Sequence, residues 1–302
     1  MTTKNLKNFN KIPFVKSAKN IEIVKKIYAK MSFIRHFELW AFNYRKAGKF
    51  QTLIYLCLGQ ESIYASVAVA IKKAYVFGQH RGHGIYLSYN GVVSKLIDEI
   101  LGLPSGTNKG MGGSPPIFDT KIGMYGHVGL IGDQVPVSAG FSLVKSDRVT
   151  ICYFGDGAAE EDYVLATFGF VSKNKLRVLF ICDDNDFSVL TKTKVRRNWK
   201  LTDVAKSFGI KSYDITDDPF TIYQTIKKLK KNDFPSLINI RTCREYWHEG
   251  AGKDITEPGQ WNRFDILTKE FNEMGLKSFV KKENNKNKKN MKLLWEKQLQ
   301  KQ

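Results

Sequence analysis

Cysteine is scarce in this sequence of 302 residues, and the four cysteines that occur form no CxxC pair. Paired thiols at short spacing mark many zinc sites and redox motifs, so both kinds of site are disfavoured. Cys152 and Cys182 lie within apolar runs, where a buried thiol behaves as a small hydrophobe. We therefore expect free thiols in a reducing, cytosolic setting, without structural disulfides.

Long apolar runs are also missing from the sequence. No segment approaches the roughly 18 consecutive apolar residues of a membrane span, and the N-terminal stretch MTTKNLKNFNKIPF lacks the apolar core of a signal peptide. Mitochondrial presequences are rich in arginine, whereas no arginine precedes Arg35 here. These absences predict a cytoplasmic protein, most simply a bacterial one, that makes no membrane contact.

Acidic residues are few relative to basic ones. The chain has 29 Asp and Glu against 48 Lys and Arg, a formal net charge of +19. Such a balance is compatible with a basic nucleic-acid-binding protein, which stays an alternative. The lysines are, however, spread along the chain and concentrated in the tail VKKENNKNKKNMKLLWEKQLQKQ, and basic residues do not alternate with aromatic ones in a nucleic-acid recognition motif. We favour a solvated surface that aids docking of an anionic cofactor or an acidic domain, and no nucleic-acid partner.

The most informative segment runs from Val149 to Leu190. It holds two apolar runs of strand length, VTICYF and RVLFICD, which are rich in β-branched and aromatic residues. Between them Val164, Phe168 and Val171 have the spacing of one helical face. A strand, a helix and a strand in this order predict two parallel neighbouring strands joined by a right-handed crossover. The expected fold class is therefore α/β, with a parallel sheet sandwiched by helices.

Oxygen ligands follow both of these predicted strands. Asp156 stands in a Gly-Asp-Gly turn, and Asn185 comes after it with 28 residues between them. Side chains at the carboxyl ends of neighbouring parallel strands meet at one edge of a sheet. Carboxylate, amide and backbone oxygens, the last from Phe187, suit Mg²⁺ with phosphate oxygens completing the shell. Gly157 allows close approach of a phosphate, and a helix starting near Ala158 would direct its free N–H groups toward that anion.

A Gly-Asp-Gly turn alone is common, but its combination with Asn185 resembles the metal-binding signature of thiamine-diphosphate enzymes. Neighbouring motifs narrow the resemblance to the alpha subunit of the decarboxylating component of 2-oxo-acid dehydrogenase complexes, over about residues 31–263. The motifs that carry this resemblance are RHFELWAFNYRKAGKF, LGQES, VFGQHRGHGIYLSYNG, KGMGGS, YGHVGLIGDQVPVSAG and RTCREYWHEGAG. The resemblance implies a thiamine-diphosphate-binding fold with an N-terminal helical extension.

The resemblance also implies roles for individual residues. Asp156, Asn185 and the Phe187 carbonyl would hold Mg²⁺, and His248 and His83 would be the catalytic imidazoles. The residues implied in cofactor binding are His80, Arg81, Gly129, Ile131, Asp156, Gly157, Ala158, Asn185, Phe187 and Arg244. From the residues alone, Arg81 is equally compatible with a surface ion pair, and His248 with an ordinary loop histidine beside Gly250 and Gly252.

The implied activity is oxidative decarboxylation of a small 2-oxo acid, with pyruvate as the default, followed by acyl transfer to a lipoyl group. A separate beta subunit would supply the glutamate that activates the cofactor, in an α₂β₂ assembly, and a lipoyl acyltransferase would be a further partner. Glu61 does not match that glutamate. His80 stands where the family has tyrosine, Asp184 replaces an asparagine, and Pro115-Pro116 replaces Met-His. A lipoyl-independent thiamine-diphosphate decarboxylase or two-carbon transferase therefore remains an alternative, as does a non-catalytic subunit.

The chain divides into three predicted parts. Residues 1–18 form a flexible arm, residues 19–270 form the α/β domain, and residues 271–302 form a Lys-rich helical tail. Within the domain we expect a long helix over residues 21–47, a helix over residues 61–73 and a late strand in SLINIR.

Overall fold

The computed structural model describes residues 17–126, 129–246, 248–250 and 261–302. The predicted arm lies almost entirely outside this part of the chain. The helices are α1 (Ala18–Lys46), α2 (Glu61–Ala70), α3 (His83–Ser88), α4 (Val93–Ile100), α5 (Gln134–Val144), α6 (Asp162–Lys173), α7 (Thr193–Arg196), α8 (Leu201–Ser207), α9 (Pro219–Lys228), α10 (Arg263–Glu273) and α11 (Lys277–Leu299). The strands are β1 (Tyr75–Phe77), β2 (Thr150–Gly155), β3 (Val178–Asp184), β4 (Phe187–Ser188), β5 (Thr191–Lys192), β6 (Lys211–Thr216) and β7 (Ser236–Arg241). Three-residue 3₁₀ turns are η3 (Thr120–Ile122), η4 (Ala158–Glu160) and η5 (Lys231–Asp233).

A five-stranded sheet organises the fold, with the strand order β1-β2-β3-β7-β6. Each neighbouring pair in this sheet is parallel, and β2 aligns with β3 so that Gly155 lies opposite Asp183. The predicted parallel pair, its connecting helix α6 and the late strand β7 are thus confirmed. The carboxyl ends of β2 and β3 lie side by side, as the sequence predicted.

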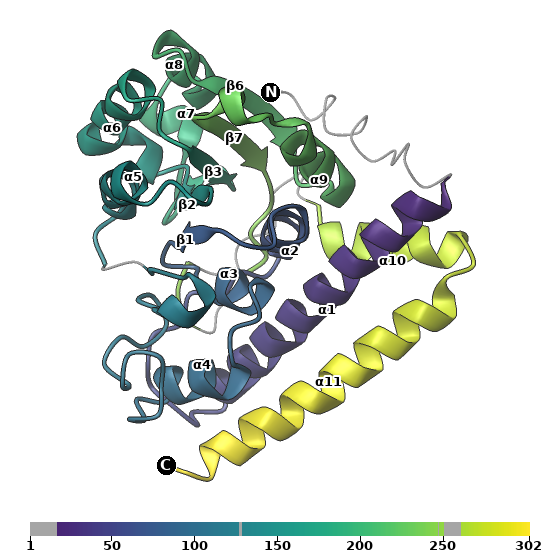
Figure 1. Ribbon diagram of the computed structural model, residues 1–302. Coiled ribbons are helices and arrows are strands. Elements are labelled where there is room, and N and C mark those ends of the chain that lie inside the picture. The colour runs from purple at the N-terminus through teal and green to yellow at the C-terminus, as the bar shows by residue number, and fades with distance from the viewer. Residues whose placement is uncertain (1–16, 127–128, 247, 251–260) are drawn as a thin grey trace.

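Alternating strand residues point to opposite faces of the sheet and feed two separate apolar clusters. Ile151 and Tyr153 of β2 pack with α1, α2 and α9, whereas Cys152 and Phe154 pack with α5, α6 and α8. Figure 1 shows these two groups of helices on opposite sides of the sheet. Because both faces of the central strands β2 and β3 are covered, these two strands read as nearly continuous apolar runs. The predicted α/β sandwich is confirmed.

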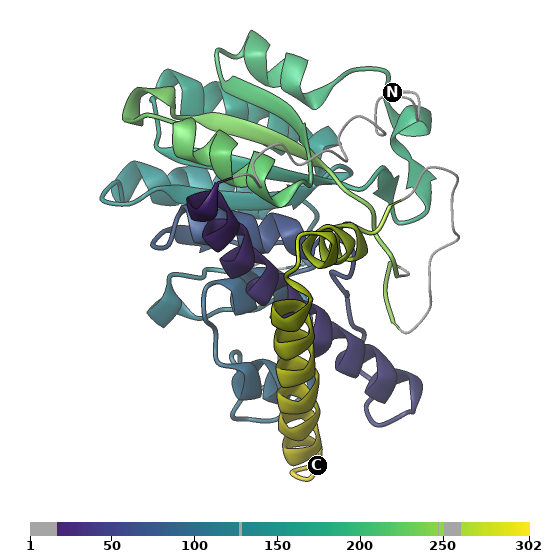
Figure 2. The same ribbon diagram turned by 90° about the vertical axis from the view of Figure 1, so that its right-hand side faces the viewer.

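The two longest helices, α1 and α11, form a layer of their own against the core (Figure 1). Trp295 of α11 is fully buried, with its ring 5.4 Å from that of Phe37 and 5.8 Å from that of Phe50. Loss of a buried aromatic of this size typically costs about 3–5 kcal/mol. Figure 2 shows α11 extending away from the sheet toward the C-terminus. The Lys-rich tail is therefore a packed helix whose apolar residues bind it to α1.

A buried carboxylate organises the glycine-rich loop that follows α4. The Glu99 side chain accepts hydrogen bonds from the backbone N–H groups of Asn108, Gly110, Gly112 and Gly113. Charge-assisted bonds of this kind are stronger than neutral ones. This loop is consequently anchored, and it places Ser114 in the interior.

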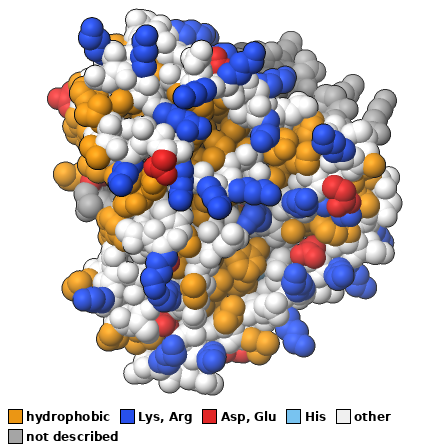
Figure 3. Space-filling model, viewed as in Figure 1, with side chains coloured by type: hydrophobic (Ala, Val, Ile, Leu, Met, Phe, Trp, Pro, Cys, Tyr) orange, Lys and Arg blue, Asp and Glu red, His pale blue; other side chains and the backbone are white. Residues whose placement is uncertain are grey.

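The surface carries the excess of basic residues. Figure 3 shows Lys and Arg side chains scattered over one face, with apolar side chains between them. Among the described residues, no helix is both long and apolar enough to cross a membrane. The four cysteines are free and buried; the burial of Cys152 and Cys182 was predicted, and that of Cys57 and Cys243 was not.

Candidate active site

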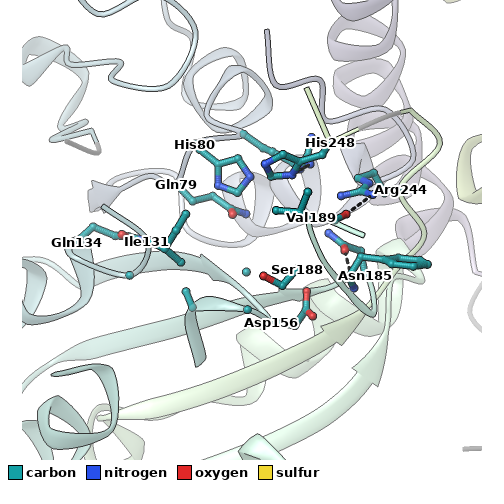
Figure 4. A pocket seen from close by; sticks show the side chains of 16 residues that line it. Gln79, His80, Ile131, Gln134, Asp156, Asn185, Ser188, Val189, Arg244 and His248 are labelled. Atoms are coloured by element: carbon teal, nitrogen blue, oxygen red, sulfur yellow. Dashed lines mark hydrogen bonds between the residues drawn. The ribbon is translucent and has the colours of Figure 1, made fainter. Parts of the chain in front are cut away.

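Loops that follow four neighbouring parallel strands converge on one cavity. His80 and Arg81 follow β1, Asp156 follows β2, Asn185 follows β3, and Arg244 follows β7. In Figure 4, Asp156 and Ser188 lie on one side of this cavity, and the imidazoles of His80 and His248 lie on the other. The remaining lining residues are Gln79, Ile131, Gly132, Gln134, Gly155, Gly157, Ala158, Phe187 and Val189. The cavity therefore has an oxygen-rich side and an imidazole side.

The oxygen-rich side contains the predicted metal ligands. Asp156 is 1% exposed, and Asn185 is 8% exposed. The Asn185 side chain is oriented from both ends, since its Nδ2 donates to Gln60 Oε1 at 2.8 Å and its Oδ1 accepts from Phe187 N at 3.1 Å. Burial and the nearby Asp184 carboxylate raise the pKa of Asp156 to about 6, although Arg196 opposes the shift. Two hard oxygen donors fixed at adjacent strand ends suit a divalent cation such as Mg²⁺.

Gly157 is required by close approach rather than by an unusual turn. Its φ is −65°, which any residue adopts, but a Cβ at this position would lie 2.7 Å from Ser188 Oγ. The predicted helix start near Ala158 is wrong. Residues Ala158–Glu160 form the 3₁₀ turn η4, and α6 begins at Asp162 after Glu161, whose ψ is 136°. The cavity is therefore lined by the start of η4, at Gly157 and Ala158, and the N-terminus of α6 lies further along the chain.

The imidazole side is strongly basic. Arg81 is 2% exposed, donates from Nη1 to Leu56 O at 2.9 Å, and places Nη2 3.2 Å from His248 Nδ1. Arg244 donates to Val189 O at 2.9 Å, and its guanidinium lies 5.5 Å from the centre of the Phe187 ring. Burial, and then Arg81 and Arg244, lower the pKa of His248 from 6.5 to about 4. His248 is therefore neutral at pH 7, with Nδ1 placed to accept from Arg81.

This environment predicts an unusual titration of His248. We expect a midpoint near pH 4, and Arg81→Gln should shift it upward because one opposing charge is removed. Between about pH 4 and 6.5 the unfolded chain binds more protons at this residue, so its contribution to stability is complete above 6.5 and is lost as the pH falls toward 4. Histidine ring NMR of the full chain, assigned with His248→Gln, measures the midpoint. A wild-type midpoint near 6.5 would contradict this structure.

Tyr55 belongs to the site, although the sequence did not suggest it. Its ring lies edge-on to both imidazoles, 5.3 Å from His80 and 5.5 Å from His248, and its hydroxyl donates to Glu249 at 3.3 Å. The His80 and His248 rings are 5.5 Å apart. Tyr55 thus fixes both imidazoles from outside the cavity. A tyrosine four residues before the Gly-Gln-Glu turn was the only available signal.

His83 does not face the cavity, which corrects the expectation for this residue. It is fully buried, with Nδ1 3.1 Å from Glu38 Oε2 and Nε2 2.8 Å from Ser114 Oγ. Ser114 Oγ also accepts from Tyr55 N at 3.0 Å. The reason is that His83 starts α3, which turns it toward α1 and the glycine-rich loop. His83 supports Tyr55 through Ser114.

Of the other predicted residues, some line the cavity and some do not. Ile131 lines the cavity and is 43% exposed, whereas Gly129, with φ of +115°, is not among the lining residues. Gln79 and Ser188 line the cavity and were not predicted; Gln79 is oriented by a hydrogen bond to the buried Asp183. Gly252 lies outside the described residues.

Comparison with known proteins identifies the family. The model of the dehydrogenase E1 component family matches residues 29–288. The chain belongs to this family. The chain is 31% identical over 257 residues to the pyruvate dehydrogenase E1 component subunit alpha of Rhizobium meliloti, covering 81% of this chain and 72% of that protein. It is 27% identical over 257 residues to the subunit of the same name from Rickettsia prowazekii, covering 81% and 77%. The predicted family resemblance is confirmed.

Solved structures of larger enzymes share the fold of this chain. Transketolase from Campylobacter jejuni superposes with a TM-score of 0.58 at 15% identity, over 93% of this chain. Transketolase from Leishmania mexicana superposes with a TM-score of 0.54 at 13% identity, over 92% of this chain. The chain spans about half the length of these transketolases, 49% and 47%. This likeness concerns the fold.

Proposed function

We propose that the chain is the alpha subunit of a thiamine-diphosphate-dependent 2-oxo-acid dehydrogenase that decarboxylates a small 2-oxo acid, with pyruvate as the first candidate. The observation that carries the proposal is the joining of Asp156 and Asn185 with His248 and two arginines around one cavity. Its relatives from Rhizobium meliloti and Rickettsia prowazekii bear the name pyruvate dehydrogenase E1 component subunit alpha, which supports this choice of substrate.

The donors present fit the cofactor's Mg²⁺-diphosphate end. Asp156 and Asn185 would hold Mg²⁺ together with the Phe187 carbonyl, and Gly157 leaves space where a Cβ would clash with Ser188. Ala158 and Ile131 supply apolar lining, Gly129 would contribute backbone beside it, and Arg244 would neutralise phosphate charge. When bound, thiamine diphosphate supplies a carbon nucleophile and accepts the electrons released by decarboxylation.

The chain's own chemistry centres on His248. Its neutral imidazole accepts from Arg81 at Nδ1, at 3.2 Å, and is enclosed by Tyr55 and His80, so Nε2 carries the proton and can donate it to the former carbonyl oxygen of the substrate. Arg81 adds positive charge where an oxyanion develops. The imidazole of His248 would also assist acyl transfer to a lipoyl group.

A second polypeptide is part of this proposal. Glu61 is fully buried and paired with Arg35 at 2.8 Å, so it does not reach the cavity to activate a cofactor. Exposed apolar residues gather on and before α5, including Leu130 at 71%, Val137 at 58% and Val144 at 78%. Monomers rarely expose large apolar patches, so this surface suits a beta subunit that brings the missing glutamate. An α₂β₂ assembly, and a lipoyl acyltransferase as further partner, complete the proposal.

A lipoyl-independent decarboxylase or two-carbon transferase is the second candidate. It is favoured by Pro115-Pro116, which follow the buried Ser114 where the family resemblance has Met-His. No imidazole is therefore available from that part of the glycine-rich loop.

Co-expression with the beta subunit tests the proposal. We expect the chain alone to be inactive and the complex to bind Mg²⁺-thiamine diphosphate in calorimetry, release CO₂ from pyruvate and acylate lipoamide. A panel of 2-oxo acids with lipoamide or an aldehyde as acceptor separates the two candidates. Absence of cofactor binding by the complex would contradict the proposed enzyme activity and would favour a non-catalytic subunit.

A further inference from the structure

The carboxylate assigned to the metal is already paired with an arginine. The Arg196 guanidinium donates to Asp156 Oδ2, and Thr193 Oγ1 donates to the same oxygen at 3.1 Å. The Asp156 side chain is 1% exposed and that of Arg196 is 12% exposed. A buried carboxylate left without a counter-ion is strongly destabilising. Arg196 therefore supplies the positive charge that a divalent cation would bring to this carboxylate.

A second carboxylate holds Arg196 from its other side. Arg196 Nη1 lies 2.5 Å from Glu160 Oε1, and Arg196 Nε donates to Thr191 O at 3.2 Å. Glu160 is 25% exposed and so is much better hydrated than Asp156. Arg196 thus bridges a buried and a partly exposed carboxylate. It can leave Asp156 and remain paired with Glu160.

The neighbouring Arg197 increases the positive charge around Asp156 and Glu160. Its Nη1 donates to the backbone oxygen of Asp156 at 2.9 Å and lies 3.2 Å from Glu160 Oε1. A bare divalent cation at Asp156 would meet two guanidinium groups within a partly buried site, where repulsion is weakly screened. A diphosphate brings several negative charges that offset both arginines. The metal and the diphosphate should consequently bind together much better than the metal alone.

The geometry points to Arg196 as an exchangeable counter-ion of Asp156, which occupies the carboxylate without metal and moves fully to Glu160 when a divalent cation arrives with a diphosphate. This inference rests on the proposed function, because it takes Asp156 as the metal ligand. It assigns to Arg196 the coupling between metal and diphosphate binding. In this respect Arg196 is a positioning residue of the cofactor site.

Binding of Mn²⁺ alone to the full chain, followed by electron paramagnetic resonance of the free ion, tests this inference. We expect Arg196→Gln to bind Mn²⁺ about ten-fold more tightly than the wild type, since a charged hydrogen bond to a buried carboxylate no longer has to be broken. With saturating thiamine diphosphate and the beta subunit, the gain should fall below about three-fold, because the variant also lacks a charge that attracts diphosphate. If Arg196 had only a structural role, its replacement would leave the coupling between metal binding and diphosphate binding unchanged.

Arg197→Gln is the matched control, because Arg197 contacts the backbone oxygen of Asp156 and Glu160. We expect it to raise Mn²⁺ affinity by less than about three-fold, because it removes one repelling charge but breaks no hydrogen bond to the Asp156 carboxylate. Equal gains in both variants would overturn the inference, since they would indicate a general charge effect. An unchanged affinity in Arg196→Gln would overturn it as well.

Arg196→Lys keeps the positive charge but loses the planar guanidinium that contacts both carboxylates at once. It therefore provides a second test if Arg196→Gln does not fold. We expect an affinity for Mn²⁺ between those of the wild type and Arg196→Gln, and a wild-type value would overturn the inference. Failure of the wild-type complex to bind Mg²⁺-thiamine diphosphate would instead contradict the proposed function. Normal cofactor binding with no effect of Arg196 would contradict only the counter-ion role.

Discussion

Asp156→Asn lowers the affinity of the αβ complex for Mg²⁺-thiamine diphosphate by roughly 100-fold or more, as we expect from loss of a charged metal ligand. The amide keeps the shape of the side chain and one oxygen, but it carries no negative charge for Mg²⁺. Arg196 stays paired with Glu160 at 2.5 Å, so the fold should survive the change. Isothermal calorimetry with Mg²⁺ and thiamine diphosphate gives the dissociation constant.

Asp203→Asn is the matched control for this measurement. Asp203 lies on α8, is 63% exposed at its side chain and is not among the residues that line the cavity. We expect its cofactor affinity to equal that of the wild type. If Asp156→Asn binds the cofactor within about three-fold of the wild type, Asp156 is not the metal ligand.

His248→Ala lowers kcat of the complex by about 10²- to 10⁴-fold, the range expected when a general acid or base is removed. The imidazole is neutral at pH 7, lies 3.2 Å from Arg81 and stands across the cavity from Asp156. It should therefore serve the reacting end of the cofactor and leave its diphosphate end unaffected. Cofactor affinity should change by less than about three-fold, so that the loss appears in kcat.

His36→Ala provides the corresponding control. His36 lies on α1, outside the lining of the cavity, and burial likewise lowers its pKa to about 4. Its replacement removes an imidazole of similar titration without touching the site. A kcat for His248→Ala close to that of His36→Ala would exclude His248 from catalysis.

The central strands were predictable because burial on both faces leaves an unbroken apolar signal. β2 and β3 are almost entirely apolar until β3 ends in Asp183-Asp184, and α6 shows one apolar helical face. The edge strand β6, KSYDIT, was not predicted, since it is half exposed and mixes charged with apolar residues. Sequence patterns reveal an element most clearly where both of its faces are enclosed.

The candidate site was predictable where it depends on a short motif, and it was not predictable where it depends on contacts between residues far apart in the sequence. Asp156 and Asn185 follow their strands directly, so their convergence could be inferred from strand polarity. His83 looked equivalent to His80 in sequence, yet the start of α3 turns it away toward Glu38 and Ser114. A helix start only two residues from Arg81 reverses the direction of a side chain, and its position depends on packing.

The sequence by itself determined the parallel α/β core, the oxygen ligands at the ends of two strands and the family to which the chain belongs, because these follow from local periodicity and short motifs. Only the tertiary structure decided that Arg196 pairs with Asp156, that Tyr55 encloses both imidazoles and that His248 is neutral. Each of these depends on burial and on charges brought together from distant segments. Electrostatic and packing energies vary with distance and solvent exposure. Neither the distance between two residues nor their exposure can be read from the sequence alone.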